Sequence, residues 1–97
     1  MPTRFDLDGK TALVTGASSG LGARFARVLA DNGAQVVLAS RRVERLKELR
    51  AEIEAAGGDA HVVALDVTDP ASIRAAIEQA ENDAGPIDIL VNNSGVS

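Results

Sequence analysis

The chain has 97 residues, enough for one domain with a modest core, and its 45% hydrophobic and 25% charged residues are typical of a soluble globular protein. Its net charge of −4 argues against nucleic acids and anionic membranes as partners. It has no cysteine, which excludes disulfides, thiolate metal sites and a cysteine nucleophile, and no apolar run resembles a membrane span or a secretory signal, so we expect a cytoplasmic protein.

Strand and helix patterns alternate along the whole chain. The strand segments are short and apolar, whereas the helical segments carry apolar residues three and four positions apart. Asp69-Pro70 begins the last helix, because aspartate caps a helix and proline suits its first position. The predicted elements are a strand at Lys10–Thr15, a helix at Gly20–Asn32, a strand at Gln35–Ala39, a helix at Val43–Ala56, a strand at Ala60–Leu65, a helix from Pro70 to the Gly85-Pro86 stop, and a strand at Ile87–Val91.

This alternation predicts an α/β fold with a parallel sheet, right-handed crossovers and helices on both faces. We expect a Rossmann-type strand order of 3-2-1-4, in which the fourth strand crosses to the far side of the first. Ligands of such sheets bind at the carboxyl ends of the strands, where the order reverses. The predicted core faces of the second and third helices are Leu46, Leu49, Ile53 and Ala56, and Ile73, Ala76, Ile77 and Ala80.

The segment Thr15-Gly16-Ala17-Ser18-Ser19-Gly20-Leu21-Gly22 joins the first strand to the first helix. A helix N-terminus offers unpaired N–H groups and a positive dipole end, which favour a phosphate. Gly16 can adopt backbone angles closed to other residues, and Gly20 and Gly22 leave room for a pyrophosphate and for helix–strand packing. An ordinary strand–helix turn is the alternative. An ATPase-type phosphate loop is disfavoured because Ala23-Arg24, not lysine and serine or threonine, follows.

Ser40-Arg41-Arg42 follows the second strand, about 20 residues after the glycine loop, where an acidic residue normally contacts the ribose of NAD. An arginine at this place can bind a 2′-phosphate through charge-assisted hydrogen bonds. We therefore predict a preference for NADP(H) over NAD(H), with Arg41 the better candidate. The alternative is that both arginines are solvated at a helix start.

Polar residues also follow the third and fourth strands. Asp66 can accept from an adenine amino group or instead cap the turn at Thr68–Pro70. The asparagines of Asn92-Asn93-Ser94-Gly95 offer amide groups that can contact a ribose or tie strand ends together, and Gly95 permits close approach of a cofactor; a simple polar turn is the alternative. His61 is the only histidine and lacks a partner cluster, so we interpret it as a partly buried or edge residue and predict no metal site.

Together these motifs resemble those of the short-chain dehydrogenase/reductase family. Thr15–Gly22 matches every fixed position of the family loop Thr-Gly-x-x-x-Gly-x-Gly, and Ser94 stands where the later family motif usually has alanine. The resemblance covers nearly the whole chain but only the N-terminal part of a family domain, which implies a truncated NAD(P)-binding Rossmann domain over residues 1–97. It implies pyrophosphate and ribose contacts at Gly16, Ser18, Ser19 and Leu21, adenosine-phosphate contact at Arg41, adenine contacts at Asp66 and Val67, and ribose contacts at Asn92 and Gly95.

The resemblance also implies hydride transfer between a nicotinamide cofactor and a carbonyl or secondary alcohol. The family's catalytic serine, tyrosine and lysine lie downstream of the last motif, and the chain has no tyrosine, so we predict no catalytic residue and no activity here. A stand-alone nucleotide-binding module and an inert fragment are the alternatives. A full-length form is expected to be a homo-oligomer, and an uncovered Ile87–Val91 strand would invite self-pairing.

Overall fold

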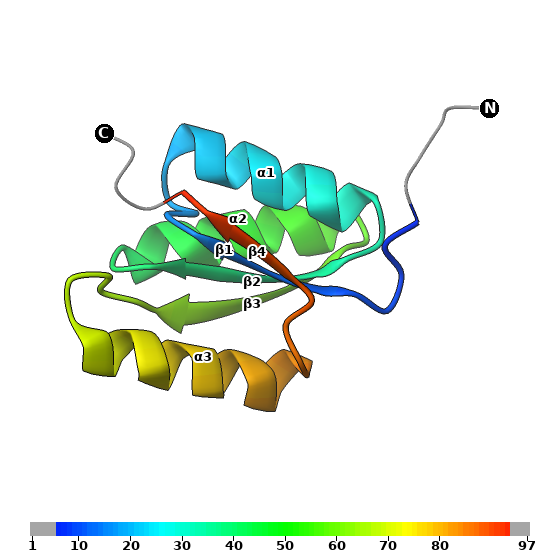
Figure 1. Cartoon of the computed structure of the whole chain (residues 1–97). Coiled ribbons are helices and arrows are strands. Elements are labelled where there is room, and N and C mark those ends of the chain that lie inside the picture. Colours follow the sequence, from blue (N-terminus) through cyan, green and yellow to red (C-terminus); the bar gives the residue numbers. More distant parts are fainter. Residues whose placement is uncertain (1–5, 94–97) are drawn as a thin grey trace.

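The structure is a computed structural model that describes residues 6–93, and its strands and helices alternate as the sequence predicts (Figure 1). Ser19 and Asp69 cap the first and third helices through their side chains, which accept from backbone N–H groups. The elements are β1 at Thr11–Thr15, α1 at Gly20–Asp31, β2 at Gln35–Ser40, α2 at Val43–Ala55, β3 at Asp59–Ala64, α3 at Pro70–Ala84 and β4 at Ile89–Asn92.

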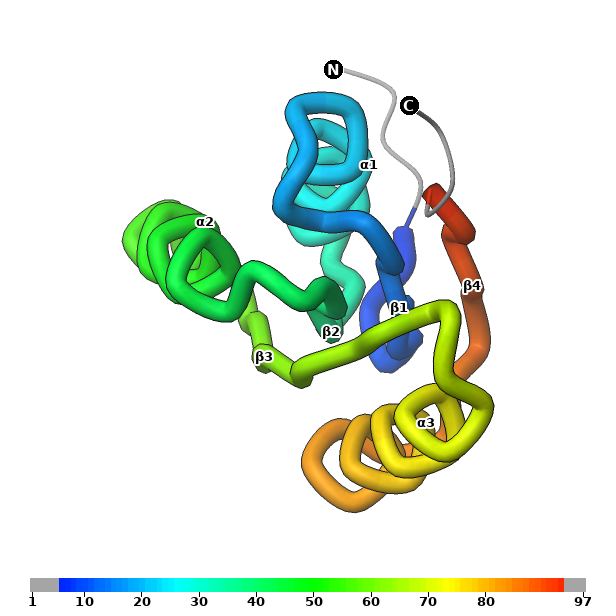
Figure 2. Tube along the Cα trace, turned by 90° about the vertical axis from the view of Figure 1, so that its left-hand side faces the viewer, coloured from blue at the N-terminus to red at the C-terminus, as the bar shows by residue number. Residues whose placement is uncertain are grey.

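The four described strands form one parallel sheet in the order β3-β2-β1-β4. Figure 2 shows α1 and α2 on one face of this sheet and α3 on the other. The predicted α/β fold and the strand order 3-2-1-4 are therefore confirmed. Because β4 crosses to the far side of β1, the carboxyl ends of these two strands lie next to each other.

The core consists of apolar layers on both sides of the sheet. Successive strand residues point to opposite faces, so a strand buried on both faces is apolar throughout. On the face of α1 and α2, Leu38 packs with Leu46 and other buried residues, and on the face of α3, Val37 packs with Ala76 and Ala80. Val37, Leu38 and Leu46 have no exposed surface, which places the centre of the core at β2.

Two predicted helix faces need correction. Ile73 and Ile77 are 36% and 39% exposed, whereas Ala76 and Ala80 are buried, because α3 lies over β3 and β2 and turns its isoleucines toward β4. Ala56 is exposed because it is the C-cap of α2, one residue past the last helical turn.

The start of β4 also differs from the prediction, because Asp88 makes a specific contact before the strand begins. Its backbone N–H donates to the carbonyl of Thr11 at 2.9 Å, and its Oδ2 accepts from the N–H of Thr11 at 2.9 Å. Asp88 therefore closes the first rung between β1 and β4, and the ladder proper runs over Ile89–Asn92.

Replacing Asp88 by alanine is expected to lower the free energy of unfolding by about 1–2 kcal/mol, because the N–H of the buried Thr11 loses its charged acceptor. Urea denaturation followed by circular dichroism measures this. Asp83→Ala, at an exposed position on α3, is the matched control and should change stability by less than about 0.5 kcal/mol. Equal effects of the two substitutions would contradict the role of Asp88.

Candidate functional site

The glycine loop leaves β1 in a tight turn and enters α1 at Ser19. Gly16 has φ +64°, in the left-handed region that favours glycine. The Oγ of Ser19 donates to the carbonyl of Gly16 at 2.9 Å and accepts from the N–H of Gly22 at 3.1 Å. The serine thus satisfies one N–H of the first helical turn and fixes the loop below it.

Gly20 and Gly22 have different surroundings. A Cβ on Gly22 would lie 2.3 Å from the carbonyl oxygen of Gly16, so the loop and the helix leave no room for a side chain there. A Cβ on Gly20 would meet nothing within 4 Å, and Leu21 beside it is 48% exposed. Gly22 therefore serves the fold, and Gly20 keeps the outer side of the helix N-terminus open to a ligand.

Asn93 ties the end of β4 to this loop. It is buried, and its Nδ2 donates to the Oγ of Ser19 at 2.8 Å and to the carbonyl of Gly16 at 3.3 Å. Its backbone N–H donates to the Oγ1 of Thr15 at 3.1 Å, while that hydroxyl donates to the Oδ1 of Asn92 at 3.0 Å. One small network therefore holds β1, β4 and α1 together.

The sequence prediction named Asn92 as the ribose contact and offered the asparagine pair as a link between strand ends. The structure shows that Asn93 makes this link, and the part played by Thr15 was missed. Asn92 is exposed at the end of β4, at the predicted edge of the sheet, and Gly95 lies outside the described residues. The available signal was the pair of asparagines after an apolar strand, but the pattern does not tell which of the two side chains points inward.

The carboxyl end of β2 closes the other side of the loop. The hydroxyls of Ser18 and Ser40 are 2.8 Å apart, and the N–H of Arg42 donates to the Oγ of Ser40 at 3.0 Å. A pocket of about 220 Å³ lies here, and the exposed Arg41 is part of its wall. The pocket brings together residues from three segments, and its lining is Gly16, Ser18, Ser40, Arg41, Arg42, Leu65 and Val67.

Asp66 takes part in the turn that the sequence offered as an alternative. Its Oδ1 accepts from the hydroxyl of Thr68 at 2.6 Å and from the N–H of Thr68 at 3.0 Å. These two hydrogen bonds, with a smaller contribution from the positive charge of Arg41, lower the pKa of the Asp66 carboxyl below its ordinary 3.8. The carboxylate is therefore ionised and held at the end of β3.

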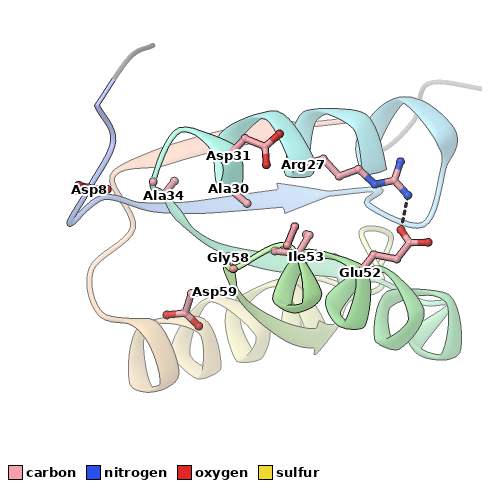
Figure 3. A pocket seen from close by; sticks show the side chains of 12 residues that line it. Asp8, Arg27, Ala30, Asp31, Ala34, Glu52, Ile53, Gly58 and Asp59 are labelled. Atoms are coloured by element: carbon pink, nitrogen blue, oxygen red, sulfur yellow. Dashed lines mark hydrogen bonds and ion pairs between the residues drawn. The ribbon is translucent and has the colours of Figure 1, made fainter. Parts of the chain in front are cut away.

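A larger cavity of about 510 Å³ lies between α1 and α2, near their C-terminal ends (Figure 3). Asp8, Asp31 and Asp59 line it, and Arg27 on its wall is paired with Glu52. Carboxylates and helix C-termini both disfavour anions, so this cavity does not suit a phosphate-bearing ligand. A phosphate-bearing ligand is better accommodated at the opposite, N-terminal ends of the helices, around the glycine loop.

The remaining features of the described residues are simple. His61 is partly buried on the edge strand β3, with its Nε2 2.9 Å from the Oε1 of Gln35, as the sequence reading proposed. Between residues 6 and 93, no group of His, Cys, Asp or Glu side chains is placed to hold a metal ion. In the same range, no helix is long and apolar enough to cross a membrane.

Comparison with known proteins gives consistent matches. A family model described as short chain dehydrogenase matches residues 10–97. A short chain dehydrogenase of Pseudocercospora fijiensis is 44% identical over 98 residues, which are 99% of this chain and 32% of the relative. Gluconate 5-dehydrogenase of Gluconobacter oxydans is 45% identical over 95 residues, which are 98% of this chain and 37% of the relative. The chain thus spans about a third of the length of the curated relatives it matches.

Solved structures agree in fold. A hydroxysteroid dehydrogenase from Escherichia coli superposes with a TM-score of 0.90 at 37% identity, over 93% of this chain and 38% of its own. A metagenomic short-chain oxidoreductase in complex with NADP superposes with a TM-score of 0.86 at 45% identity, over 91% of this chain and 40% of its own.

Gly22→Ala is expected to lower the free energy of unfolding by about 1–3 kcal/mol, because the new Cβ pushes the Gly16 carbonyl and the loop away from α1. Gly20→Ala is the matched control at the same helix end, and it should keep or slightly raise stability because its Cβ meets open space. Thermal and urea denaturation measure both variants. A Gly20→Ala variant as unstable as Gly22→Ala would contradict the division of roles.

Thr68→Val is expected to raise the pKa of Asp66 toward 3.8, because one of its two hydrogen-bond donors is lost. Since the folded-state pKa is lowered, the stabilisation by this carboxylate is present above pH 3.8 and disappears as the pH falls through the folded-state pKa. Carboxyl-detected NMR titration measures the shift. Thr68→Ser keeps the hydroxyl and should leave the pKa in place, and a valine variant that titrates like the parent would refute the assignment.

Proposed function

The chain belongs to the short-chain dehydrogenase family, and we propose that residues 1–97 are the NADP(H)-binding part of an oxidoreductase. Its reaction would be hydride transfer between the nicotinamide and a small carbonyl compound or secondary alcohol. The observation that carries the proposal is the open glycine loop over the N-terminus of α1, joined by Asn93 to the end of β4. We also propose a cytoplasmic location and no nucleic-acid or membrane partner, from the charge and composition.

The loop suits a pyrophosphate for three reasons. The first turn of α1 presents backbone N–H groups and the positive end of the helix dipole. No side chain stands in front of that turn at Gly20. Ser18 adds a hydroxyl group on the same loop, Ser19 fixes the shape of the loop through its own hydrogen bonds, and Leu21 offers apolar surface to the nicotinamide side. When bound, the cofactor would supply the hydride, and these residues would hold and orient it.

The preference for NADP(H) is supported by the pocket beside Ser40. Its wall carries the side chains of Arg41 and Arg42 and the hydroxyls of Ser18 and Ser40. These are hydrogen-bond donors for a 2′-phosphate, and no acidic residue among the described residues lines this pocket to hold the 2′-hydroxyl of NAD instead. We place adenine against Asp66 and Val67 and the adjoining ribose near Asn92, with Gly95 beyond the described residues. The metagenomic neighbour's structure contains NADP.

A second candidate is a nucleotide-binding module without chemistry, favoured by the absence of tyrosine from the sequence. Hydride transfer to a carbonyl needs a proton donor for the developing alkoxide. The described residues supply binding and orientation, so we assign no catalytic residue among them. Catalysis and substrate choice would then depend on residues other than the described ones. The oligomeric contacts of a longer form would depend on such residues too.

Arg41→Ala is expected to weaken NADPH binding by about 10- to 100-fold and to leave NADH binding nearly unchanged, because only NADPH carries the 2′-phosphate. Isothermal titration calorimetry or the change in nicotinamide fluorescence measures both affinities. Arg50→Ala is the control, because Arg50 pairs with Glu54 on the same helix away from the pocket. Equal affinities of the unaltered protein for NADPH and NADH, or an equal loss of both in Arg41→Ala, would overturn the NADP(H) assignment.

A further inference from the structure

A group of arginines flanks the glycine loop on the side of α2. The protein has a net charge of −4, yet Arg41, Arg42 and Arg45 fall within a stretch of five residues where β2 ends and α2 begins. All three are exposed. Arg41 and Arg42 line the pocket beside Ser40, whereas Arg45 lies outside it. Such a concentration of positive charge on an acidic protein favours the binding of an anion nearby.

Arg45 lies on the side of α2 that faces α1. It lines a second pocket, of about 140 Å³, whose walls include Ser18 of the loop, Arg27 of α1 and Glu48 of α2. Figure 2 looks onto this end of the molecule, where α1 and α2 begin side by side. Ser18 belongs to the walls of both pockets, so Arg45 and the pocket beside Ser40 lie on adjacent sides of one serine.

The carboxylates of this groove between α1 and α2 leave Arg45 without an ion pair. The guanidinium of Arg27 is paired with Glu52 across the groove. The other two basic residues of α2 are paired with glutamates of the same helix. Within residues 6–93, no carboxylate lies at ion-pair distance from Arg45, although Glu48 follows it by one helical turn on the same side. The positive charge of Arg45 is therefore available to a ligand.

The glycine loop has no cation of its own to offer. Thr15–Gly22 contains neither lysine nor arginine. Arg24 comes two positions after Gly22, which faces the sheet, so at about 100° per residue its side chain points away from the sheet. Because Arg27 is already paired, Arg45 is the cation that the groove between α1 and α2 can bring to the loop.

The charge of a 2′-phosphate calls for such a cation, and this step rests on the proposed binding of NADP(H). A phosphate monoester carries a charge of about −1.5 to −2 at pH 7, because its second pKa is about 6. Arg41 and Arg42 bring two positive charges to the pocket, but the ionised Asp66 beside Arg41 offsets part of them. A third guanidinium would complete the balance of a dianion.

We propose that Arg45 is this third guanidinium, and that it determines, together with Arg41, the preference for a 2′-phosphate. In the complex it reaches across Ser18 from the groove, so that arginines bind the phosphate from both sides of that serine. An arginine suits this approach, because its long stem carries a charged fork of N–H donors to the phosphate oxygens. Glu48 competes for the same guanidinium and therefore acts against phosphate binding.

The first test compares adenosine 2′,5′-bisphosphate with adenosine 5′-monophosphate, which differ only in the 2′-phosphate, by isothermal titration calorimetry. Arg45→Gln should weaken the bisphosphate by about tenfold or more, as for the loss of a charged hydrogen bond, and change the monophosphate by less than about twofold. Glu48→Gln should tighten the bisphosphate by about two- to fivefold, because the competing carboxylate is removed. Arg50→Gln is the matched control on the same helix and should change neither.

The outcomes separate this inference from the cofactor assignment, with circular dichroism confirming that each variant is folded. Loss of the bisphosphate in Arg41→Ala but not in Arg45→Gln would overturn the role of Arg45 alone. Equal affinities of the unaltered protein for the two nucleotides would overturn the NADP(H) assignment, and the role of Arg45 with it. An equal loss of both nucleotides in Arg45→Gln would mark a general structural effect and would also overturn the proposal.

The second test observes the phosphate itself by phosphorus NMR, at concentrations of the bisphosphate that saturate each variant. Guanidinium groups beside the bound 2′-phosphate stabilise its dianion and lower its second pKa. Arg45→Gln should raise that pKa, and Arg50→Gln should leave it in place, because only Arg45 is expected to contact the phosphate. If the bound 2′-phosphate titrates identically in the unaltered protein and in Arg45→Gln, the contact does not exist.

Discussion

The contact between the backbone at Gly16 and the first turn of α1 is the constraint on which the site depends. The carbonyl oxygen of Gly16 occupies the space that a Cβ of Gly22 would fill. Only a residue without a side chain lets the helix begin directly above the end of β1. This closeness points the N–H groups of the first turn at the carboxyl edge of the sheet, where a phosphate can accept from them.

The same carbonyl also joins β4 to the loop. It accepts from Ser19 within the loop and from the amide of Asn93, and the Thr15 hydroxyl holds the Asn93 backbone. Thr15 and Asn93 are buried, and a buried donor or acceptor left without a partner costs about 1–3 kcal/mol. The network is therefore satisfied only when β4 occupies its place beside β1. The placement of β4 beside β1 therefore creates the binding edge. It also satisfies the hydrogen bonds that shape the glycine loop.

Sequence patterns predicted those parts of this arrangement in which the interacting residues are close together in the sequence. The apolar runs, the cap at Asp69 and the glycine spacing in Thr15–Gly22 act within a few residues, and the strand order followed from the alternation of elements. The asparagine pair suggested a link between strand ends, but the pattern did not show that Asn93 makes it, because the contact is with a loop more than 70 residues earlier. Asp88 was missed for the same reason, since its partner Thr11 is 77 residues away.

The exposed isoleucines of α3 show a second limit of pattern reading, and they connect the site to the rest of the molecule. Helical periodicity marks Ile73 and Ile77 as apolar-face residues, but it does not tell how far the neighbouring sheet extends. The described sheet ends at β4, so the face that periodicity predicts is only half covered. β4 lies beside these isoleucines, and Asn93, directly after the strand, provides the amide that holds the glycine loop. The position of this one strand therefore decides both how far the isoleucines of α3 are covered and how the glycine loop is held.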